Sequence, residues 1–210
     1  MTFFEDDDDD HDDDHEPDSL APFDPVASRL LKARTIIISG GINQRLTARV
    51  TAQLLAISSD SSSDPITIVL NSQGGHVEAG DTIHDMIRFV PAPVRVVGTG
   101  WVASAAALIF VSVPRERRFC LPNTRFLLHQ PAGGGGGSAS DIEIEAREIL
   151  KMRDRLNRIF ARETGQTLQR IEDDTHRNFW LSADDAKAYG IVGHIIERWT
   201  QLEETTKAAG

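Results

Sequence analysis

Cysteine is nearly absent from this sequence of 210 residues, in which Cys120 is the only one. One thiol cannot form an intramolecular disulfide and offers no pair of cysteine ligands to a metal ion. A protein with so few thiols is expected in a reducing compartment. Long apolar runs are also missing, because no stretch approaches the length that spans a membrane. The sequence therefore predicts neither a disulfide-stabilised fold nor a membrane protein.

Basic residues are missing from the first 20 positions, which hold eleven Asp and Glu and no Lys or Arg. Like charges this dense repel one another, so residues 1–24 are predicted to form a disordered acidic tail. An acidic N-terminus is the opposite of a signal or transit peptide, which favours a cytoplasmic location. Residues 21–210 carry 22 Lys and Arg against 21 Asp and Glu, a formal charge of +1, although the whole chain has −10. A nearly neutral folded part argues against a nucleic-acid-binding surface.

Aromatic residues make up only 6% of the chain, whereas hydrophobic residues as a whole reach 40%. The core is therefore expected to consist mainly of aliphatic side chains. A chain of this length can bury one such core. We predict a single domain at residues 25–200, followed by a short C-terminal tail at 201–210.

Short apolar runs alternate with segments of helical periodicity in the first half of this domain. The predicted elements are strands at 35–39, 66–70, 94–98, 118–120, 126–128 and 191–196, and helices at 44–57, 78–89, from Ser104, from Leu168 and from Ser182. Strands that alternate with helices at this spacing are typical of parallel crossover units. The sequence therefore predicts an α/β fold with a parallel sheet, whose ligands gather at the carboxyl ends of the strands.

A long helix is expected after a run of five glycines, beginning at a capping box of Ser140 and Glu143. Its apolar residues Ile142, Ile149 and Leu156 recur every seven positions. Such a stripe is too narrow for a core helix and favours packing against another copy of the same helix.

Ser104 lies within the small and apolar run 100–110, where a strand is expected to pass into a helix. A helix N-terminus offers unpaired N–H groups and a partial positive charge, which suits a serine whose attack creates a negative oxygen. Such a serine needs an adjacent base, and histidine is the usual one. His129 is the candidate, because it ends an apolar strand and precedes Gln130 and Pro131. The same pattern also fits a histidine with a purely structural role.

Gly74 and Gly75 follow the strand predicted at 66–70 and allow the backbone to approach another group closely. The intermediate of acyl transfer needs two N–H donors aimed at its oxyanion, each contributing roughly 2.7–4 kcal/mol. The N–H of Gly75 is one candidate, and the N–H of Ala105, directly after Ser104, is the other. Taken alone, the glycine pair also fits a plain turn. Together these residues predict an acyl-transfer site.

Several of these segments resemble, in order and with matching spacing, motifs of the proteolytic subunit of the Clp protease. The segment 71–80 is similar to the Asn-Ser-Pro-Gly-Gly motif of that family, and the run around Ser104 is similar to its nucleophile segment. The histidine region, the start of the long helix and the closing segment are matched by 118–131, 140–150 and 181–192. The resemblance extends from about Ser28 to about Ile196.

The resemblance implies a crotonase-like α/β fold of repeated ββα units with a protruding long helix. It also implies a serine endopeptidase in which Ser104 is the nucleophile, His129 the general base and then acid, and Asn178 the third member of the triad. Gly75 and Ala105 would form the oxyanion hole. The chain itself would hold no cofactor or metal.

The same resemblance implies an assembly of two stacked seven-membered rings, homomeric or mixed, around a closed chamber. A Clp-type AAA+ unfoldase would use ATP to thread unfolded proteins into that chamber. Neither a membrane nor a nucleic acid is expected among the partners. The chain would thus be one subunit of an ATP-dependent protease.

Three positions depart from the family pattern. Asn178 stands where the family has aspartate, Gln73 where it has proline, and Ala105 where it has methionine. An amide accepts the imidazole N–H but carries no charge, and an Asp-to-Asn change in a serine protease triad can cost about 10⁴ in turnover. Weak or partner-dependent activity is therefore expected. Asp173 and Asp174 are near in sequence, but a helix from Leu168 would turn them elsewhere.

Two alternatives to an active peptidase remain open at the level of sequence. The first is a weakly active or structural subunit that completes a mixed ring with an active paralogue. The second is an acyl-CoA hydratase of the same fold, in which Ser104 and His129 would have no evident role.

Overall fold

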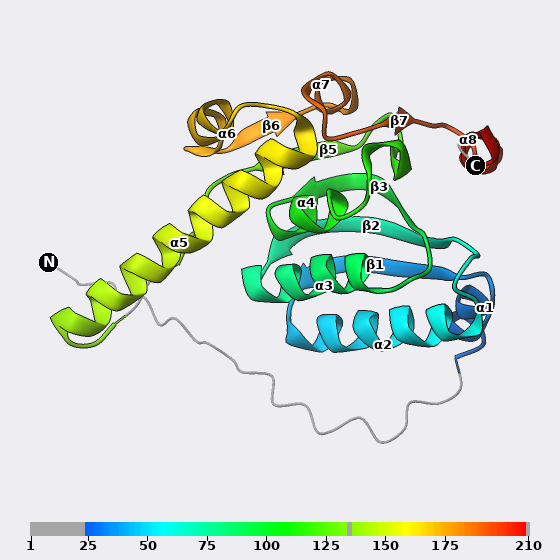
Figure 1. The fold of residues 1–210 in the computed structure, drawn as a ribbon, viewed down its shortest axis with the longest axis horizontal. Coiled ribbons are helices and arrows are strands. Elements are labelled where there is room, and N and C mark those ends of the chain that lie inside the picture. The colour runs from blue at the N-terminus through cyan, green and yellow to red at the C-terminus, as the bar shows by residue number, and fades with distance from the viewer. Residues whose placement is uncertain (1–23, 134–135, 209–210) are drawn as a thin grey trace, which may run out of the picture.

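The computed structural model describes residues 24–133 and 136–208, which form an α/β domain around a mainly parallel sheet (Figure 1). The strands of this described part are β1 (Thr35–Ile42), β2 (Ile66–Gly75), β3 (Val94–Ala103), β4 (Arg118–Cys120), β5 (Arg125–Leu128), β6 (Phe179–Leu181) and β7 (His194–Ile195). The sheet runs in the order β1-β2-β3-β4-β7, and β5 pairs with both β3 and β6. The β5–β6 pair is antiparallel, and the other pairs are parallel. The expected α/β fold with a parallel sheet is confirmed.

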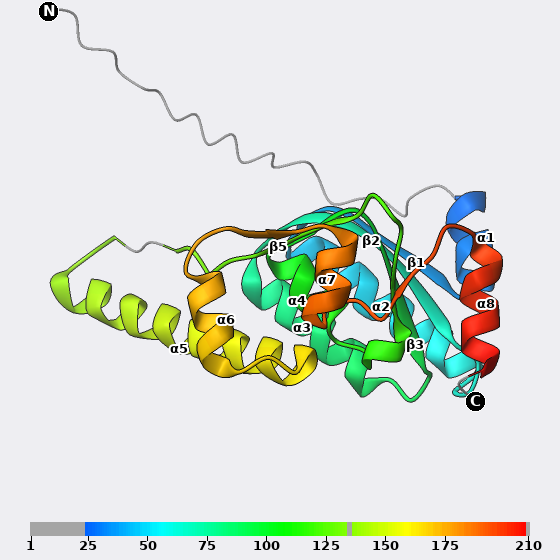
Figure 2. The ribbon, with the colours of Figure 1, turned by 90° about the horizontal axis from the view of Figure 1, so that it is seen from above.

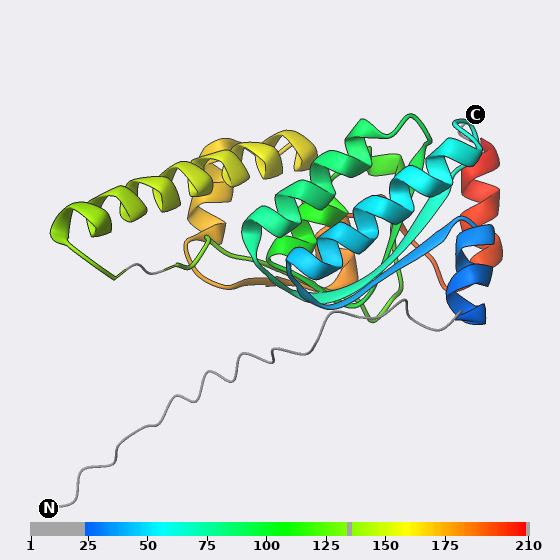
Figure 3. The ribbon, with the colours of Figure 1, turned by 90° about the horizontal axis from the view of Figure 1, so that it is seen from below.

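Helices connect the strands and cover the sheet. They are α1 (Pro25–Lys32), α2 (Gln44–Asp60), α3 (Val77–Phe89), α4 (Ala105–Phe110), α5 (Ala139–Thr164), α6 (Leu168–Thr175), α7 (Ala183–Tyr189) and α8 (Trp199–Ala208), with a short 3₁₀ turn at Arg115–Arg117. Figure 3 shows α2 and α3 side by side across the sheet. Among the helices of the described residues, none is long and apolar enough to cross a membrane.

The core follows the periodicity of the sequence. Each of the apolar positions predicted to lie on one side of α2 is buried, namely Leu46, Val50, Leu54 and Ile57. In β1, Ile36 and Ile38 are buried while Ile37 between them is half exposed, as expected for a strand with one covered face. Burial of these aliphatic side chains is the main stabilising term of the fold.

Strands β1, β2 and β3 continue beyond their predicted ends. Their extra residues pair across irregularities in the parallel ladders, such as that between Ser39 and Gly41 in β1 and that between Leu70 and Ser72 in β2. The Gly74–Gly75 pair therefore belongs to the end of β2, and the alternative of a plain turn is wrong. The pairing brings the ends of β2 and β3 together at one edge of the sheet.

Helix α5 begins two residues earlier than predicted. The capping box consists of Ser138 and Asp141, not Ser140 and Glu143: the Asp141 N–H donates to Ser138 Oγ at 3.3 Å, and the Ser138 N–H donates to the Asp141 carboxylate at 3.0 Å. The helix ends at Gly165, which adopts a left-handed conformation with φ +77°.

The two halves of α5 have different surroundings. Its N-terminal half projects from the domain (Figure 2), and Ile142 there is 49% exposed. Its C-terminal half packs on the domain, and Leu156 is only 8% exposed. The predicted seven-residue stripe is therefore wrong at Leu156, because this residue is used by the core of its own chain.

The C-terminal region also differs from the expectation. Of the tail predicted at 201–210, residues 201–208 form most of α8, where Leu202 is buried against Val97, Phe119 and Ile196, and residues 209–210 lie outside the described part. The closing strand predicted at 191–196 is reduced to β7. The acidic tail predicted at 1–24 lies outside the described residues except for Asp24, whose side chain caps α1 by accepting the Val26 N–H at 2.8 Å.

Candidate active site

Ser104 lies at the point where β3 ends and α4 begins. Its backbone has φ +56° and ψ −122°, a region that non-glycine residues rarely adopt and that is found at strained functional positions. The Ser104 N–H donates to Leu127 O at 2.9 Å, and the Ser104 carbonyl accepts the Ala107 N–H at 2.9 Å. The hydroxyl makes no capping hydrogen bond to the helix, although Ser104 occupies the N-cap. The strained backbone is therefore not explained by helix capping.

Gly74 lies directly beside the nucleophile candidate, and Gly75 lies against Ile42 of β1. A Cβ atom on Gly74, whose φ is +96°, would lie 2.7 Å from Ser104 Cβ and 3.1 Å from the Ala105 nitrogen. A Cβ atom on Gly75, whose φ is +149°, would lie 2.3 Å from Ile42 O. Both positions therefore require glycine. The backbone of Gly74 therefore comes close to Ser104 and to the Ala105 amide, and Gly75 follows it directly in the chain.

Helix α4 is completely buried and packs tightly against α3. A Cβ atom added to Gly80 of α3 would lie 3.0 Å from the Cβ of Ala105. Small residues at both positions let the two helices approach closely. The N-terminus of α4 is thereby held against the end of β2.

His129 follows β5 directly, as predicted, and its ring is oriented by a main-chain acceptor. Its Nδ1 lies 2.8 Å from the carbonyl oxygen of Gln130. A carbonyl oxygen only accepts hydrogen bonds, so Nδ1 carries the hydrogen of the neutral ring. Nε2 is then unprotonated, which is the form a general base needs.

Ser104 and His129 line the same pocket. The other residues of its wall are mostly apolar, namely Val77, Ala105, Leu108, Leu128, Pro131, Leu156 and Phe160. The pocket has a volume of about 20 Å³, which is about the space that one water molecule needs. The structure therefore brings the predicted nucleophile and base to one narrow, largely apolar site.

Asn178 lies beside the histidine but is not seen to orient it. It precedes β6, in which Phe179 pairs with Leu128, and it lines a second pocket together with His129. The hydrogen bond of the ring is made with Gln130, not with Asn178. The sequence predicts Asn178 near His129, and the two residues do line one pocket. It does not identify the carbonyl of Gln130 as the acceptor, because a main-chain acceptor leaves no signature in the sequence.

Asp173 and Asp174 are engaged elsewhere, as the predicted helix implied. Asp173 accepts a hydrogen bond from Gln169, and Asp174 pairs with Arg170 and accepts the hydroxyl of Tyr189 at 2.7 Å. Burial, together with the Asp174 carboxylate, raises the pKa of Tyr189 above its ordinary value. These carboxylates therefore do not replace the missing aspartate.

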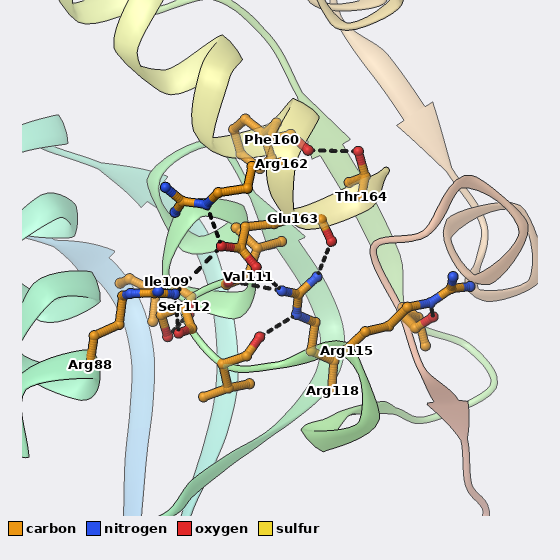
Figure 4. Close-up of polar contacts among 12 residues, drawn as sticks. Arg88, Ile109, Val111, Ser112, Arg115, Arg118, Phe160, Arg162, Glu163 and Thr164 are labelled. Carbon is orange, nitrogen blue, oxygen red and sulfur yellow. Dashed lines mark hydrogen bonds and ion pairs between the residues drawn. The ribbon is translucent and has the colours of Figure 1, made fainter. Parts of the chain in front are cut away.

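The far end of α4 is fixed by a buried arginine that the sequence analysis did not single out. Arg118 is 0% exposed, and its guanidinium donates to the carbonyls of Val111 at 3.1 Å, Val113 at 2.6 Å and Glu163 at 2.7 Å. It also pairs with the Glu163 carboxylate (Figure 4). Burial lowers the pKa of Arg118, and the Glu163 charge opposes that shift.

Glu163, near the C-terminal end of α5, also pairs with two further arginines. Arg162 pairs with its carboxylate at 2.9 Å and Arg88 of α3 at 3.5 Å (Figure 4). The cluster ties α3, α5 and the segment after α4 to one carboxylate. It thereby sets the position of α4, whose opposite end presents Ser104.

Cys120 does not offer a competing nucleophile. Cys120 is buried, and burial raises its pKa to about 12, so that its thiol is not ionised at neutral pH. Within the described ranges, no group of three His, Cys, Asp or Glu side chains is arranged to hold a metal ion.

Comparison with known proteins gives consistent matches. The family model for Clp protease matches residues 21–199. The ATP-dependent Clp protease proteolytic subunit 2 of Gluconobacter oxydans is 57% identical over 185 residues, covering 87% of this chain and 82% of the relative. The ATP-dependent Clp protease proteolytic subunit 3 of Rhizobium johnstonii is 60% identical over 169 residues, covering 80% of this chain and 87% of the relative.

Solved structures agree with these sequences. An asparagine-to-aspartate mutant of ClpP1 from Listeria monocytogenes is similar with a TM-score of 0.79 and 55% identity. ClpP1 from the same organism is similar with a TM-score of 0.76 and 54% identity. Each comparison covers 84% of this chain and 99% of the solved chain.

Proposed function

This chain belongs to the Clp protease family and is a Clp-type serine endopeptidase subunit, and we propose that Ser104 is its nucleophile. The crotonase-like α/β fold expected from the sequence is confirmed. The observation that carries the assignment of the nucleophile is the narrow pocket that Ser104 shares with His129. The alternative of a structural subunit is not favoured, since the relatives are named proteolytic subunits.

Acyl-enzyme chemistry follows from these positions. Ser104 Oγ attacks the carbonyl carbon of a peptide bond while Nε2 of His129 takes the hydroxyl proton. The N–H groups of Gly75 and Ala105 stabilise the oxyanion of the tetrahedral intermediate. The imidazolium then gives its proton to the leaving amine, which leaves an ester on Ser104. Water, deprotonated by His129, hydrolyses this ester and restores the enzyme.

Asn178 is proposed as the third member of this triad. It lines a pocket together with His129, and its amide supplies no negative charge to the imidazolium that forms in both steps. The correct tautomer is already provided by the Gln130 carbonyl. The missing contribution is therefore the charge, and the resulting activity is weak.

Replacing Asn178 by aspartate is expected to increase peptide cleavage roughly 10- to 100-fold. This gain is smaller than the factor of about 10⁴ associated with Asp-to-Asn in a triad where asparagine imposes the wrong tautomer. The measurement is the kcat/KM for a fluorogenic peptide. Asn123→Asp, which changes an exposed asparagine between β4 and β5, is the matched control. An unchanged kcat/KM in folded Asn178→Asp protein would mean that another group already supplies the charge.

Membership of the family implies an oligomer that works with Clp ATPases. We propose the two stacked seven-membered rings expected from the resemblance, with a Clp-type AAA+ unfoldase delivering unfolded proteins in the cytoplasm. ATP would be used by that partner, and the chain would need no cofactor of its own. The projecting half of α5 supports the double ring, because Ile142 and Leu150, which share one side of it, are about half exposed.

A lysine at Leu150 is expected to divide the double ring into single rings. Leu150 is 50% exposed in the isolated chain, and burial of a charge in place of this apolar side chain would be strongly unfavourable. Sedimentation velocity should then show a species of about half the mass. Glu148→Lys places the same charge on nearly the opposite side of α5 and should leave the assembly whole. If the two variants sedimented with the same mass, the proposed contact between rings through Leu150 would be contradicted.

A further inference from the structure

Gln130 is held at three points, and one of them is the ring of His129. Its main-chain N–H donates to Thr175 O at 2.9 Å, and its side-chain Nε2 donates to His176 O at 3.0 Å. Its carbonyl oxygen accepts the hydrogen of His129 Nδ1 at 2.8 Å. One residue therefore connects the imidazole to the C-terminal end of α6.

The two carbonyls that Gln130 binds belong to the end of a helix. Thr175 is the last residue of α6, and His176 is its C-cap. The last carbonyls of a helix have no partner within the helix and need one from outside. Gln130 supplies both donors, one from its main chain and one from its side chain, and together they hold its Cα against the end of α6. The carbonyl that faces His129 projects from this anchored Cα, in the peptide group that joins Gln130 to Pro131.

The end of α6 is itself anchored in the core. The buried hydroxyl of Thr175 donates to Ile171 O at 2.7 Å and lies 3.3 Å from the amide oxygen of Asn157 on α5, which is also buried. A continuous series of contacts therefore leads from α5 through Thr175 and Gln130 to the ring. Movement of α5 relative to α6 would be transmitted to His129.

We propose that Gln130, and not Asn178, is the residue that positions the imidazole in this chain. The inference rests on the proposed function, because it concerns the base of the same site. The Gln130 carbonyl keeps the hydrogen on Nδ1 and leaves Nε2 free to accept the proton of Ser104. The carboxamide of Gln130 acts at a distance, by fixing that carbonyl to α6. A triad with Asn178 can therefore retain the correct tautomer.

The test measures the rate at which a fluorophosphonate probe labels Ser104. Gln130→Ala removes the side-chain anchor, and Gln130→Glu keeps its size but replaces the donor by a carboxylate that repels His176 O. Each variant is expected to label roughly 3- to 10-fold more slowly, the range for loss of one hydrogen bond. Gln166→Ala is the matched control, because Gln166 also donates from its side chain to a carbonyl, that of Tyr189 at 2.9 Å. It should label at the wild-type rate.

A double-mutant cycle separates positioning from general support of the fold. With Asn178→Asp in place, the new carboxylate can itself hold Nδ1–H, so the loss caused by Gln130→Ala should shrink to less than about twofold. A purely structural role would give the same loss in both backgrounds, and this would overturn the proposal. So would wild-type labelling rates in both Gln130 variants.

The proposed function and the inference fail in different ways. Absence of Ser104 labelling in the wild-type protein would overturn the proposed function and the inference with it. Normal labelling of the wild type with no effect of Gln130→Ala and Gln130→Glu would overturn the inference alone. Thermal unfolding and sedimentation of each variant establish that the rates refer to folded protein in the same assembly.

Discussion

Replacing Ser104 by alanine is expected to abolish covalent labelling and to lower peptide cleavage by about 10⁴- to 10⁵-fold, which is less than the roughly 10⁶ for loss of a serine from a complete triad, because the charge missing at Asn178 already lowers the activity. No other group in the pocket can form the acyl intermediate, since its remaining wall is apolar apart from His129. The fold should persist, because alanine adopts the same φ of +56° as serine and the replacement removes no capping hydrogen bond. Labelling with a fluorophosphonate probe, followed by mass spectrometry of the modified peptide, measures the effect.

Ser112→Ala is the control for Ser104→Ala. Ser112 lies just beyond the opposite end of α4, where its buried hydroxyl donates to Ile109 O at 2.7 Å. Its loss should leave labelling intact while lowering stability by about 1 kcal/mol. Labelling that survives Ser104→Ala would place the reactive group elsewhere and remove the basis of the proposed chemistry.

Local patterns were sufficient to predict much of the fold. The apolar positions of α2 are buried as their spacing indicated, and the start of α6 at Leu168 agrees with the sequence. These features depend on residues three or four apart, so the sequence itself contains the signal. The meeting of Ser104 and His129 followed from a second rule, that parallel strands present their carboxyl ends at one edge.

Features that depend on distant partners could not be predicted in this way. The end of β2, Asn71–Gly75, consists of small and polar residues with little tendency to form a strand, and its pairing with β1 is what extends it. Arg118 stands in a strand that otherwise looks apolar, and its acceptor Glu163 is 45 positions away. The acceptor for His129 is a main-chain carbonyl, which every residue possesses and no motif marks.

The apolar stripe of the long helix α5 also could not be assigned to its partners from the sequence. Its periodicity predicted one continuous stripe, but the structure divides it between the core of the domain and the projecting half. Leu156 packs beside Phe160 and lines the pocket of Ser104, whereas Ile142 is exposed. Periodicity indicates which side of a helix is apolar and does not indicate which partner covers it.

Replacing Arg118 by methionine is expected to destabilise the domain by about 3–5 kcal/mol, because three carbonyls lose a buried donor at roughly 1–3 kcal/mol each. The carbonyls of Val111, Val113 and Glu163 would lose their donor in a site that water does not reach easily. Glu163 keeps Arg88 and Arg162, so the loss comes mainly from these carbonyls. For a domain of this size the melting temperature should fall by roughly 6–20 °C.

The matched control is Arg158→Met, which removes an exposed pair between Arg158 and Asp154 on the same helix α5. Exposed pairs contribute about 0–1 kcal/mol, so its melting temperature should change little at the same protein concentration.

Loss of Arg118 should also slow the labelling of Ser104 at temperatures well below the melting temperature. Helix α4 has only six residues. A shift at its C-terminal end, where Arg118 binds Val111 O, therefore moves Ser104 at its N-terminal end. A wild-type melting temperature in Arg118→Met would show that the three carbonyls find other partners. An unchanged labelling rate of Ser104 would show that α4 is positioned by its packing against α3 alone.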